Sequence, residues 1–385
     1  MGASVRSLAW SALRAGFQPI GLDLFGDQDL LAVGPAQRIV ARDYPLGLEK
    51  LAASYPDAIP CVYSGAMENH PRLVDALSRQ RPLWGICGNA LRAARDPVRV
   101  ATVLREAGLP APQVRFEPAG VPRDGTWIQK PLASAGGRRI EVWASGSTRF
   151  GEPSYFQQRL VGDTLAAVYL ARVGQAELLG VTRQVLGRGG SEFAYQGSCG
   201  PVALAPKIRQ QFEKIGSVFA SELGLAGLFG VDTVLHEGEP WVVEINPRYS
   251  ASVEVLELSQ GRAFLREHAL AFGAVEDLET ARAVKQDRPA VVGKMIVDAS
   301  GRFQVGDVKI PASLDLWKAP EVADVPQPGT EFRVGEPVLT VFETGSSVEE
   351  CLAGLQRRAE DWRQRIQRFT GIATGATSPL VDRWR

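Results

Sequence analysis

Two carboxylates and an amide lie at spacings that favour a metal site in the segment LFGVDTVLHEGEPWVVEINPR, residues 228–248. Two apolar strands flank a turn, so the spacing predicts a β-hairpin centred on Gly238. A hairpin folded about that glycine places Asp232 opposite Glu244, with Cβ atoms about 5 Å apart. Because side chains alternate along a strand, Glu244 and Asn246 share one face. We therefore expect Asp232, Glu244 and Asn246 to converge on one patch.

Two opposed carboxylates repel each other, so this patch needs protonation, solvent or a cation. Carboxylate and amide oxygens suit Mg²⁺, which commonly binds the phosphates of nucleotides. Arg248 follows the strand after Pro247, and its fork of N–H donors suits a phosphoryl oxyanion. The alternative is an exposed carboxylate pair beside a surface arginine.

A second candidate element is the glycine loop in WIQKPLASAGGRRIEVW, residues 127–143. Small residues at 133–137 allow several backbone N–H groups to face phosphate oxygens, and Lys130 supplies a cation at the end of the preceding strand. The chain has no GxxxxGK[ST] motif, so this is not a P-loop. The alternative is a glycine hairpin with a surface lysine.

A third element, YFQQRLVGDTLAAVYLA, is predicted to form strand, turn and strand over residues 155–171. Backbone groups at 157–160 could pair with the edge of an adenine ring. The alternative is a plain core strand.

Composition excludes several other functional classes. The chain has 385 residues, with 43 basic and 43 acidic side chains, which argues against broad binding to nucleic acid or acidic membranes. Its four cysteines form no CxxC pair and its three histidines form no HExxH motif, which argues against a disulfide framework and against zinc chemistry. No apolar run approaches the ~20 residues of a membrane span, and no signal peptide is visible, so we expect a cytoplasmic protein.

The elements that must position these residues begin with an alternation of short strands and helices, typical of an open parallel sheet. Ligands of such sheets bind beyond the carboxyl ends of the strands, which makes Asp23, Glu68 and Asn69 candidate site residues. The alternative for each is a loop or cap position. The chain opens on a Gly-Ala-Ser loop followed by a helix pattern. Because such loops usually follow a strand, we expect a first strand to lie upstream or to be supplied by something else.

Further along the chain, apolar periodicity predicts helices over residues 206–225 and 253–272, a hairpin over 291–305 and a terminal amphipathic helix from residue 348. Four domains are predicted: an N-terminal α/β domain, a central subdomain, a second subdomain with the metal strand, and a β-rich extension with the terminal helix. Their ranges are residues 1–95, 96–165, 166–288 and 289–385.

In this order the three motifs resemble those of the ATP-grasp superfamily, over residues 2–345. The stretches SGAMENHP, LLGVTRQ, NPRYSASVE and DVPQPGTEFRVGEPVLTVF are most similar to predicted ATP-dependent carboligases distantly related to biotin carboxylase. Relatives of these carboligases are linked to methanopterin and methylofuran one-carbon metabolism. The resemblance implies an N-terminal parallel α/β domain, a small central α+β domain and a C-terminal α+β domain with an antiparallel sheet.

The resemblance also assigns roles to residues. Asp232, Glu244 and Asn246 match ligands of Mg²⁺, with Mn²⁺ as the alternative metal, and Arg248 matches the arginine beside an acyl phosphate. Lys130, the second catalytic candidate, matches a phosphate-binding lysine. The residues that match ATP contacts are Lys130, Ser134, Ala135, Gly136, Gly137, Gln157, Gln158, Arg159, Leu160, Asp163 and Thr164.

This sequence departs from the family pattern at the helix that enters the central domain. The family usually has a lysine at the start of this helix, where this chain has Pro97. Arg95 and Arg99 are the nearby cations that could substitute for it.

The function implied is an ATP-dependent ligase that activates a small-molecule carboxylate as an acyl phosphate and joins it to an amine, releasing ADP and phosphate. The alternatives are an ATP-dependent carboxylase or phosphotransferase of the same fold, or a nucleotide-binding subunit without catalysis. Neither nucleic acid nor membrane is expected as a partner, and association into a homodimer is left open. The candidate substrate contacts are Glu68, Asn69, Arg183, Gln184, Tyr249, Ser250 and Lys294. For Arg183, Gln184 and Lys294 the alternative is an ordinary surface side chain.

Overall fold

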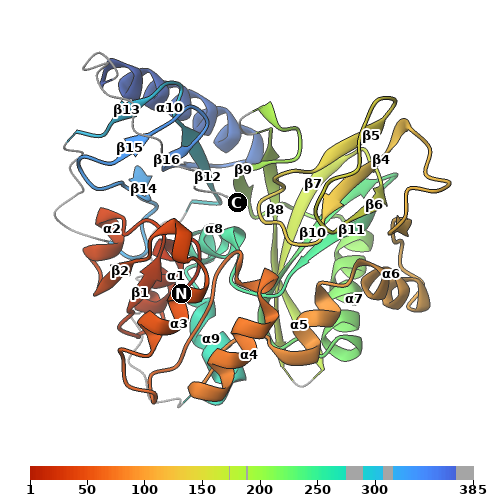
Figure 1. The fold of residues 1–385 in the computed structure, drawn as a ribbon, viewed down its shortest axis with the longest axis horizontal. Coiled ribbons are helices and arrows are strands. Elements are labelled where there is room, and N and C mark those ends of the chain that lie inside the picture. Colours follow the sequence, from red (N-terminus) through yellow and green to blue (C-terminus); the bar gives the residue numbers. More distant parts are fainter. Residues whose placement is uncertain (173, 188–189, 275–288, 307–314, 370–385) are drawn as a thin grey trace.

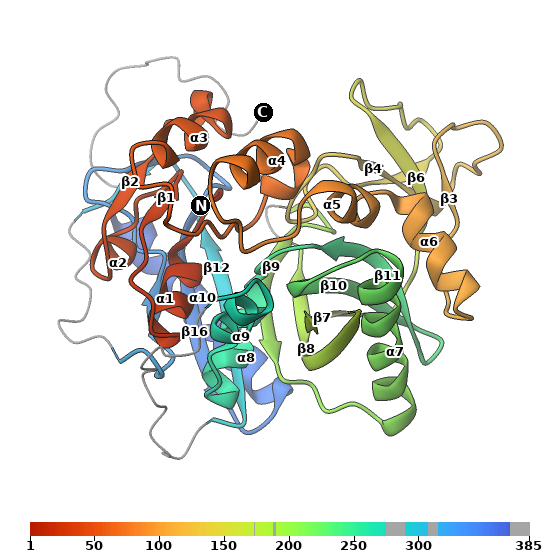
Figure 2. The same ribbon diagram turned by 90° about the horizontal axis from the view of Figure 1, so that it is seen from below.

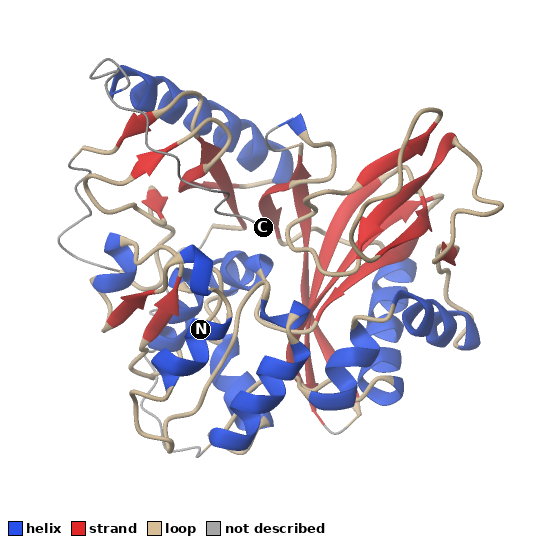
Figure 3. Ribbon diagram, viewed as in Figure 1, coloured by secondary structure: helices blue, strands red, loops and turns tan. Residues whose placement is uncertain are grey.

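The computed structural model describes residues 1–172, 174–187, 190–274, 289–306 and 315–369 of the chain. It combines an N-terminal group of helices and short parallel strands with a four-stranded and an eight-stranded antiparallel sheet (Figure 1). In Figure 3 the strands of the four-stranded sheet stand at the upper right, above helices of the middle of the chain, and the long terminal helix lies along the upper edge. The predicted mixed α/β class is confirmed.

The N-terminal part contains one parallel strand pair, β1 with β2, and a single parallel bridge between Cys61 and Leu83. Residues 1–3 form backbone hydrogen bonds with two different segments. Gly2 N–H donates to Leu22 O at 3.1 Å, and Ala3 N–H donates to Gly65 O at 3.2 Å. The expected βα alternation is therefore present, with shorter strands than the pattern predicted. Its elements are α1 (Arg6–Arg14), β1 (Gly21–Asp23), α2 (Gln28–Leu31), β2 (Ala36–Arg38), α3 (Leu46–Ala52), the short 3-10 turn η2 (Met67–Asn69), α4 (Pro71–Gln80) and α5 (Gly88–Ala94).

The four-stranded sheet is entered through helix α6 (Pro97–Glu106). The Asp96 carboxylate caps this helix by accepting from the N–H groups of Val98 and Arg99, and Pro97 suits its first turn because proline lacks the N–H. The strand order is β3-β6-β4-β5. The strands are β3 (Val114–Arg115), β4 (Asp124–Pro131), β5 (Glu141–Ala144) and β6 (Ser154–Gln158).

Side chains alternate between the two faces of the sheet along β6, and this alternation decides which residues share a face. Phe156 is fully buried in a small core with Trp127 and Trp143 on one face. Tyr155 and Gln157 therefore point to the opposite face. Lys130 of β4 pairs in register with Tyr155, so the lysine and Gln157 share that face.

The eight-stranded sheet has the order β11-β10-β7-β8-β9-β12-β16-β14. Helix α7 (Pro206–Glu222) packs against its β7–β8 part (Figure 2). The strands are β7 (Asp163–Arg172), β8 (Gln175–Leu186), β9 (Tyr195–Gly200), β10 (Gly227–His236), β11 (Glu239–Asn246), β12 (Val291–Asp298), β14 (Val322–Ala323) and β16 (Pro337–Gly345). Strands on both sides of residue 289 thus share one sheet, and the division into two domains at that point stays a prediction.

Two element predictions in the C-terminal half were wrong. The expected hairpin over 291–305 does not form, because β12 pairs with β9 and β16 while β13 (Phe303–Gln304) pairs with β15 (Glu331–Phe332). The expected helix over 253–272 is two helices, α8 (Ala251–Gln260) and α9 (Phe264–Ala271), because Gly261 adopts a left-handed φ of 64° that ends the first. The terminal helix is confirmed as α10 (Val348–Phe369).

Helix α8, which directly follows the motif NPRYS, is fixed to the N-terminal part by buried charges. Glu254 of α8 pairs with Arg6 of α1 and, at 2.9 Å, with Lys294 of β12. One turn further along α8, Glu257 pairs with Arg14 at 2.8 Å. Buried charges are stable only when paired, so these contacts favour one placement of α8 and of the loop before it. Within the described ranges, no helix combines the length and apolarity needed to cross a membrane.

Candidate functional site

The predicted hairpin of strands β10 and β11 is confirmed, including the pairing of Asp232 with Glu244. The centre of the turn lies between Glu237 and Gly238, half a residue before the predicted centre at Gly238, because His236 pairs with Glu239. Both residues between this pair have positive φ. That backbone is typical of a tight type I′ turn. A β-bulge between Asp232 and Thr233 then restores the expected register at the carboxylates.

The two carboxylates and the amide lie together, as expected. Asn246 Nδ2 donates to Asp232 Oδ2 at 2.9 Å, and Gln184 Nε2 donates to Asp232 Oδ1 at 3.0 Å. Burial, and after it the charge of Glu244, raise the pKa of Asp232 to about 7. Burial opposes ionisation of Glu244 as well, but Arg95 and Lys130 outweigh it and lower the pKa of that carboxyl.

This donor set fits a divalent cation in kind, because carboxylate and amide oxygens are the ligands that Mg²⁺ prefers. Asn246 Oδ1 accepts from Arg248 at 2.9 Å, so it would exchange this contact to act as a ligand. Among the described residues, no group of three or more His, Cys, Asp or Glu side chains is placed to hold a metal ion. The candidate metal site therefore rests on two carboxylates and one amide.

Three cationic side chains surround these ligands. Arg95 donates to Glu244 Oε1 at 2.8 Å. Lys130 is buried and donates to Val243 O at 3.0 Å. Arg248 uses its Nε for Glu68 Oε1 at 2.9 Å and its Nη1 for Tyr249 O at 3.1 Å. Such a ring of fixed donors favours an anionic ligand of high charge.

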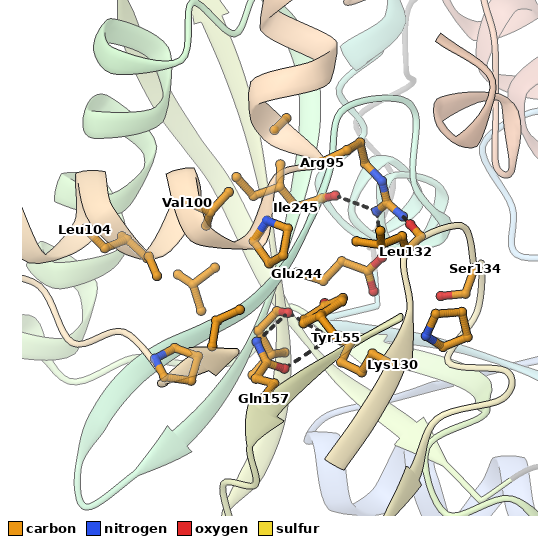
Figure 4. A pocket seen from close by; sticks show the side chains of 18 residues that line it. Arg95, Val100, Leu104, Lys130, Leu132, Ser134, Tyr155, Gln157, Glu244 and Ile245 are labelled. Carbon is orange, nitrogen blue, oxygen red and sulfur yellow. Dashed lines mark hydrogen bonds and ion pairs between the residues drawn. The ribbon is translucent and has the colours of Figure 1, made fainter. Parts of the chain in front are cut away.

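A cavity of about 360 Å³ joins the three sequence motifs between the two antiparallel sheets. Lys130, Gln157, Val243 and Glu244 also line a second cavity of about 40 Å³, which lies against helix α6. Figure 4 shows this smaller cavity, with Arg95 above Glu244 and Lys130 and Gln157 below. The larger cavity has the size of a small-molecule pocket.

The glycine loop is held from two sides. Tyr195 N–H donates to Gly136 O at 2.9 Å, and Asn69 Nδ2 donates to Ser134 O at 3.1 Å. Gly137 has a φ of 68°, and a Cβ atom there would lie 1.9 Å from Phe193 O. The loop can approach the β8–β9 connection only because this position has no side chain.

We expect Gly137→Ala to displace the glycine loop and weaken nucleotide binding at least about tenfold, since the new Cβ overlaps a backbone oxygen and moves the loop from its place in the cavity wall. Gly136→Ala is the matched control, because Gly136 has a φ of 65° but nothing lies within 4 Å of its Cβ position. Titration of both variants with an ATP analogue measures the difference. Equal affinities would show that the contact with Phe193 does not position the loop.

Most of the predicted ATP contacts meet in the larger cavity. Ser134 lines the smaller cavity, whereas Ala135 and Asp163 are absent from the described lining of both. The predicted residues that line the larger cavity are Lys130, Gly136, Gly137, Gln157, Gln158, Arg159, Leu160, Thr164, Gln184, Asp232, Glu244, Asn246, Arg248 and Ser250.

The other predicted substrate contacts lie outside that cavity. Glu68 is buried and holds Arg248, while Asn69 holds the glycine loop. Arg183 forms an exposed ion pair with Asp163 at 2.9 Å. Tyr249 is packed in the core, with its hydroxyl donating to Ser7 O at 3.2 Å. Lys294 belongs to the buried pair with Glu254.

Asp23 also lies away from the site. It is buried and accepts hydrogen bonds from the N–H groups of Val5, Phe25 and Gly26. Asp23 therefore has the structural role of a loop or cap residue, which was the alternative to a role in the site.

Several lining residues were not predicted. Tyr155 could have been predicted, because side chains alternate along a strand and residues 155 and 157 therefore share one face. Tyr195 and Ser252 line the cavity without a local pattern that marks them. Arg99, the other candidate substitute for the family lysine, is an exposed side chain that donates to Glu222 O at 3.5 Å, whereas Arg95 contacts a candidate metal ligand.

The raised pKa of Asp232 predicts a pH-dependent stability. Folded Asp232 keeps its proton up to a pH of about 7, against an ordinary value of 3.8, so the folded chain binds more protons between these values. The stability that this group contributes is therefore present below pH ~4 and is lost as the pH rises through ~7. We expect Asp232→Asn to raise the midpoint of thermal unfolding more at pH 8 than at pH 5.

Asp75→Asn is the control for this prediction. Its hydrogen bond with Arg92 lowers the pKa of Asp75, so that carboxylate stays ionised in both states above pH 5. Its effect should be constant from pH 5 to pH 8. A constant effect for Asp232→Asn as well would show that Asp232 ionises normally.

Part of the chain matches a known domain family. Residues 94–252 match the sequence model of the ATP-grasp domain, a segment that includes the glycine loop and both strands of the hairpin. The carbamoyl phosphate synthase large chain of Helicobacter pylori is 30% identical over 93 residues, which are 24% of this chain and 8% of that relative. This chain thus spans only a small part of that curated relative.

Two solved structures share the architecture over nearly the whole chain. The biotin carboxylase domain of 2-oxoglutarate carboxylase from Hydrogenobacter thermophilus, a dimer in complex with MgADP, ADP and bicarbonate, has a TM-score of 0.69 at 14% identity and covers 93% of this chain and 88% of that one. L-amino acid ligase from Bacillus licheniformis has a TM-score of 0.65 at 16% identity and covers 93% and 96%. The fold is thus the ATP-grasp fold, as the motifs predicted.

Proposed function

We propose that the protein is an ATP-dependent ligase that activates a small-molecule carboxylate as an acyl phosphate and joins it to an amine. The observation that supports it most is the shared cavity. The glycine pair, Lys130, the 157–160 backbone, the two carboxylates and Arg248 all line the same 360 Å³ space. Phosphoryl transfer depends on position and neutralised charge more than on a protein nucleophile, and this cavity offers both.

The residues divide into binding and transfer roles. The backbone at 157–160 would contact the adenine edge, and the glycine loop with Lys130 would hold the phosphates. Mg²⁺, or Mn²⁺ as the alternative, would be held by Asp232, Glu244 and Asn246 and would neutralise phosphate charge. Arg248, Ser250 and Ser252 line the same cavity at the start of helix α8, where they would hold the carboxylate beside the γ-phosphate.

The reaction then proceeds in two displacements. A carboxylate oxygen attacks the γ-phosphorus and ADP leaves, which forms the acyl phosphate. The amine nitrogen attacks the acyl carbon, phosphate leaves, and the nitrogen loses a proton to give the amide. Arg248 would stabilise negative charge in the first step, because its guanidinium donors are fixed by Glu68 and Tyr249 O.

The test is ADP release with panels of carboxylic acids and primary amines, followed by mass spectrometry. A ligase requires both an acid and an amine, and its product has the mass of the two joined less one water. ADP release that requires bicarbonate would instead indicate a carboxylase, and a phosphorylated product without an amine would indicate a phosphotransferase. ATP binding without ADP release under every combination would contradict the proposal and favour a non-catalytic subunit.

The assignment of the substrates to methanopterin- or methylofuran-type cofactor synthesis rests on the sequence resemblance alone. Including pterin and furan precursors in the same panels tests it.

A further inference from the structure

Arg95 lies where three parts of the chain meet at the candidate metal site. It is the last residue of the turn that ends α5, and its side chain is only 16% exposed. Its Nη1 donates to Glu244 Oε1 at 2.8 Å, and its Nη2 donates to Asn69 Oδ1 at 3.0 Å. The Nη2 group also lies 3.4 Å from Leu132 O, at the start of the glycine loop. One guanidinium thus contacts the N-terminal part, the glycine loop and strand β11 together. Figure 4 shows Arg95 beside Leu132 and Glu244.

Asn69 extends this set of contacts to the tip of the glycine loop. Its Oδ1 accepts from Arg95 while its Nδ2 donates to Ser134 O at 3.1 Å. Both the oxygen and the nitrogen of the Asn69 amide are hydrogen-bonded, so movement of Arg95 also moves the amide that donates to Ser134 O. The four residues Glu244, Arg95, Asn69 and Ser134 therefore form one continuous chain of hydrogen bonds.

A cation at Glu244 and the Arg95 ion pair compete for the same carboxylate. A guanidinium keeps its charge at every accessible pH, so Arg95 cannot relieve repulsion from a metal ion by losing a proton. It relieves the repulsion by moving away from Glu244 Oε1. The 40 Å³ cavity lined by Arg95, Pro97, Leu132 and Ser134 gives room for this movement, since one water molecule needs about 10–15 Å³.

We propose that Arg95 is a positioning residue that couples metal binding at Glu244 to the position of the glycine loop through Asn69. The inference rests on the proposed function, because it takes Glu244 as a metal ligand. It differs from a role as a simple phosphate ligand, since the coupling operates without nucleotide. Arg95 opposes binding of the metal alone and, at the same time, orders the loop that covers the phosphates.

The experiment uses the full-length protein, Mn²⁺ alone as the probe and no nucleotide. Electron paramagnetic resonance titration measures Mn²⁺ affinity, and hydrogen exchange measures protection of residues 132–138. In the wild type we expect Mn²⁺ to change the protection of this loop. Arg95→Met should bind Mn²⁺ about tenfold more tightly, because a like charge is gone, while its loop exchanges faster and no longer responds to Mn²⁺.

Two further variants separate charge from geometry. Arg95→Lys keeps the charge but loses the planar fork, so Mn²⁺ affinity should stay near the wild-type value while the loop response is lost. Asn69→Ala should give the same result, because it leaves the ion pair and removes the contact with Ser134. Arg99→Met is the matched control, an exposed arginine in the first turn of the next helix, α6, and should alter neither readout.

Wild-type Mn²⁺ affinity in Arg95→Met, or an intact loop response in Asn69→Ala, would overturn the coupling. Glu244→Gln distinguishes this outcome from failure of the proposed function. If Mn²⁺ binds equally well to Glu244→Gln and to the wild type, Glu244 is not a metal ligand, and both the metal assignment and the coupling fail. If Glu244→Gln loses Mn²⁺ but Arg95→Met behaves as the wild type, only the coupling fails.

Discussion

Replacing Glu244 with Gln is expected to lower ADP-forming turnover by about 10³-fold or more. Metal neutralisation of a transferring phosphoryl group is worth several kcal/mol, and about 4 kcal/mol corresponds to a factor of 10³. The substitution keeps the shape of the side chain but removes the charge that pairs with Arg95 at 2.8 Å. It leaves one carboxylate, Asp232, in the candidate metal site. ADP release in the presence of the accepted acid and amine measures the loss.

Glu239→Gln is the matched control for this variant. Glu239 lies on the same strand, at the turn, and accepts from Gln211 at 3.1 Å outside both cavities. Its turnover should equal that of the wild type. Thermal unfolding of both variants confirms that they are folded. Full activity in Glu244→Gln would refute the metal assignment and, with it, the proposed mechanism.

Arg248→Lys is expected to lower turnover about 10²-fold with little change in the KM for ATP. Lysine keeps a positive charge beside buried Glu68 but cannot reproduce the three donor directions that reach Glu68, Tyr249 O and Asn246. Loss of one preoriented donor to a developing oxyanion typically costs about 10²–10³ in turnover. An effect on kcat without an effect on the KM for ATP indicates an interaction made in the transition state.

Arg183→Lys, the same substitution at an arginine of strand β8, is the matched control. Arg183 forms an exposed pair with Asp163 and does not line the described cavity, so its replacement should leave kcat unchanged. A rise in the KM for ATP in Arg248→Lys without a fall in kcat would assign Arg248 to nucleotide binding instead of transfer.

Local sequence patterns were sufficient to predict the two strands that carry the candidate metal ligands. The alternation of β11 and the short turn at Gly238 specify that Glu244 and Asn246 share a face opposite Asp232, and the observed pairing confirms this. Hairpin register depends on residues a few positions apart, so it can be inferred from the chain alone. The helices at 206–222 and 348–369 were equally predictable, because their apolar faces repeat at the helical period.

Local patterns failed where partners are distant in the sequence. Strand β12 was expected to pair with the segment that follows it, but the sheet provides β9 and β16 as longer partners on its two sides. Lys294 was considered as a substrate contact or a surface lysine, yet it is buried against Glu254, 40 positions away. Neither the partners of β12 nor the burial of Lys294 can be inferred from the sequence of a single strand or helix.

The sequence by itself therefore determined the candidate site residues and the strands and helices that carry them, because residue type and strand or helix period are local properties. Only the tertiary structure decided that Arg95 and not Arg99 reaches Glu244. It also decided that Glu68 pairs with Arg248, that Asn69 donates to the glycine loop, and that Gly137 has no room for a side chain. These outcomes depend on how the N-terminal part and the two sheets close on one another. That closure is set by packing and charge pairs between distant segments, such as Arg6 with Glu254 and with Asp324, whose sequence separations are 248 and 318.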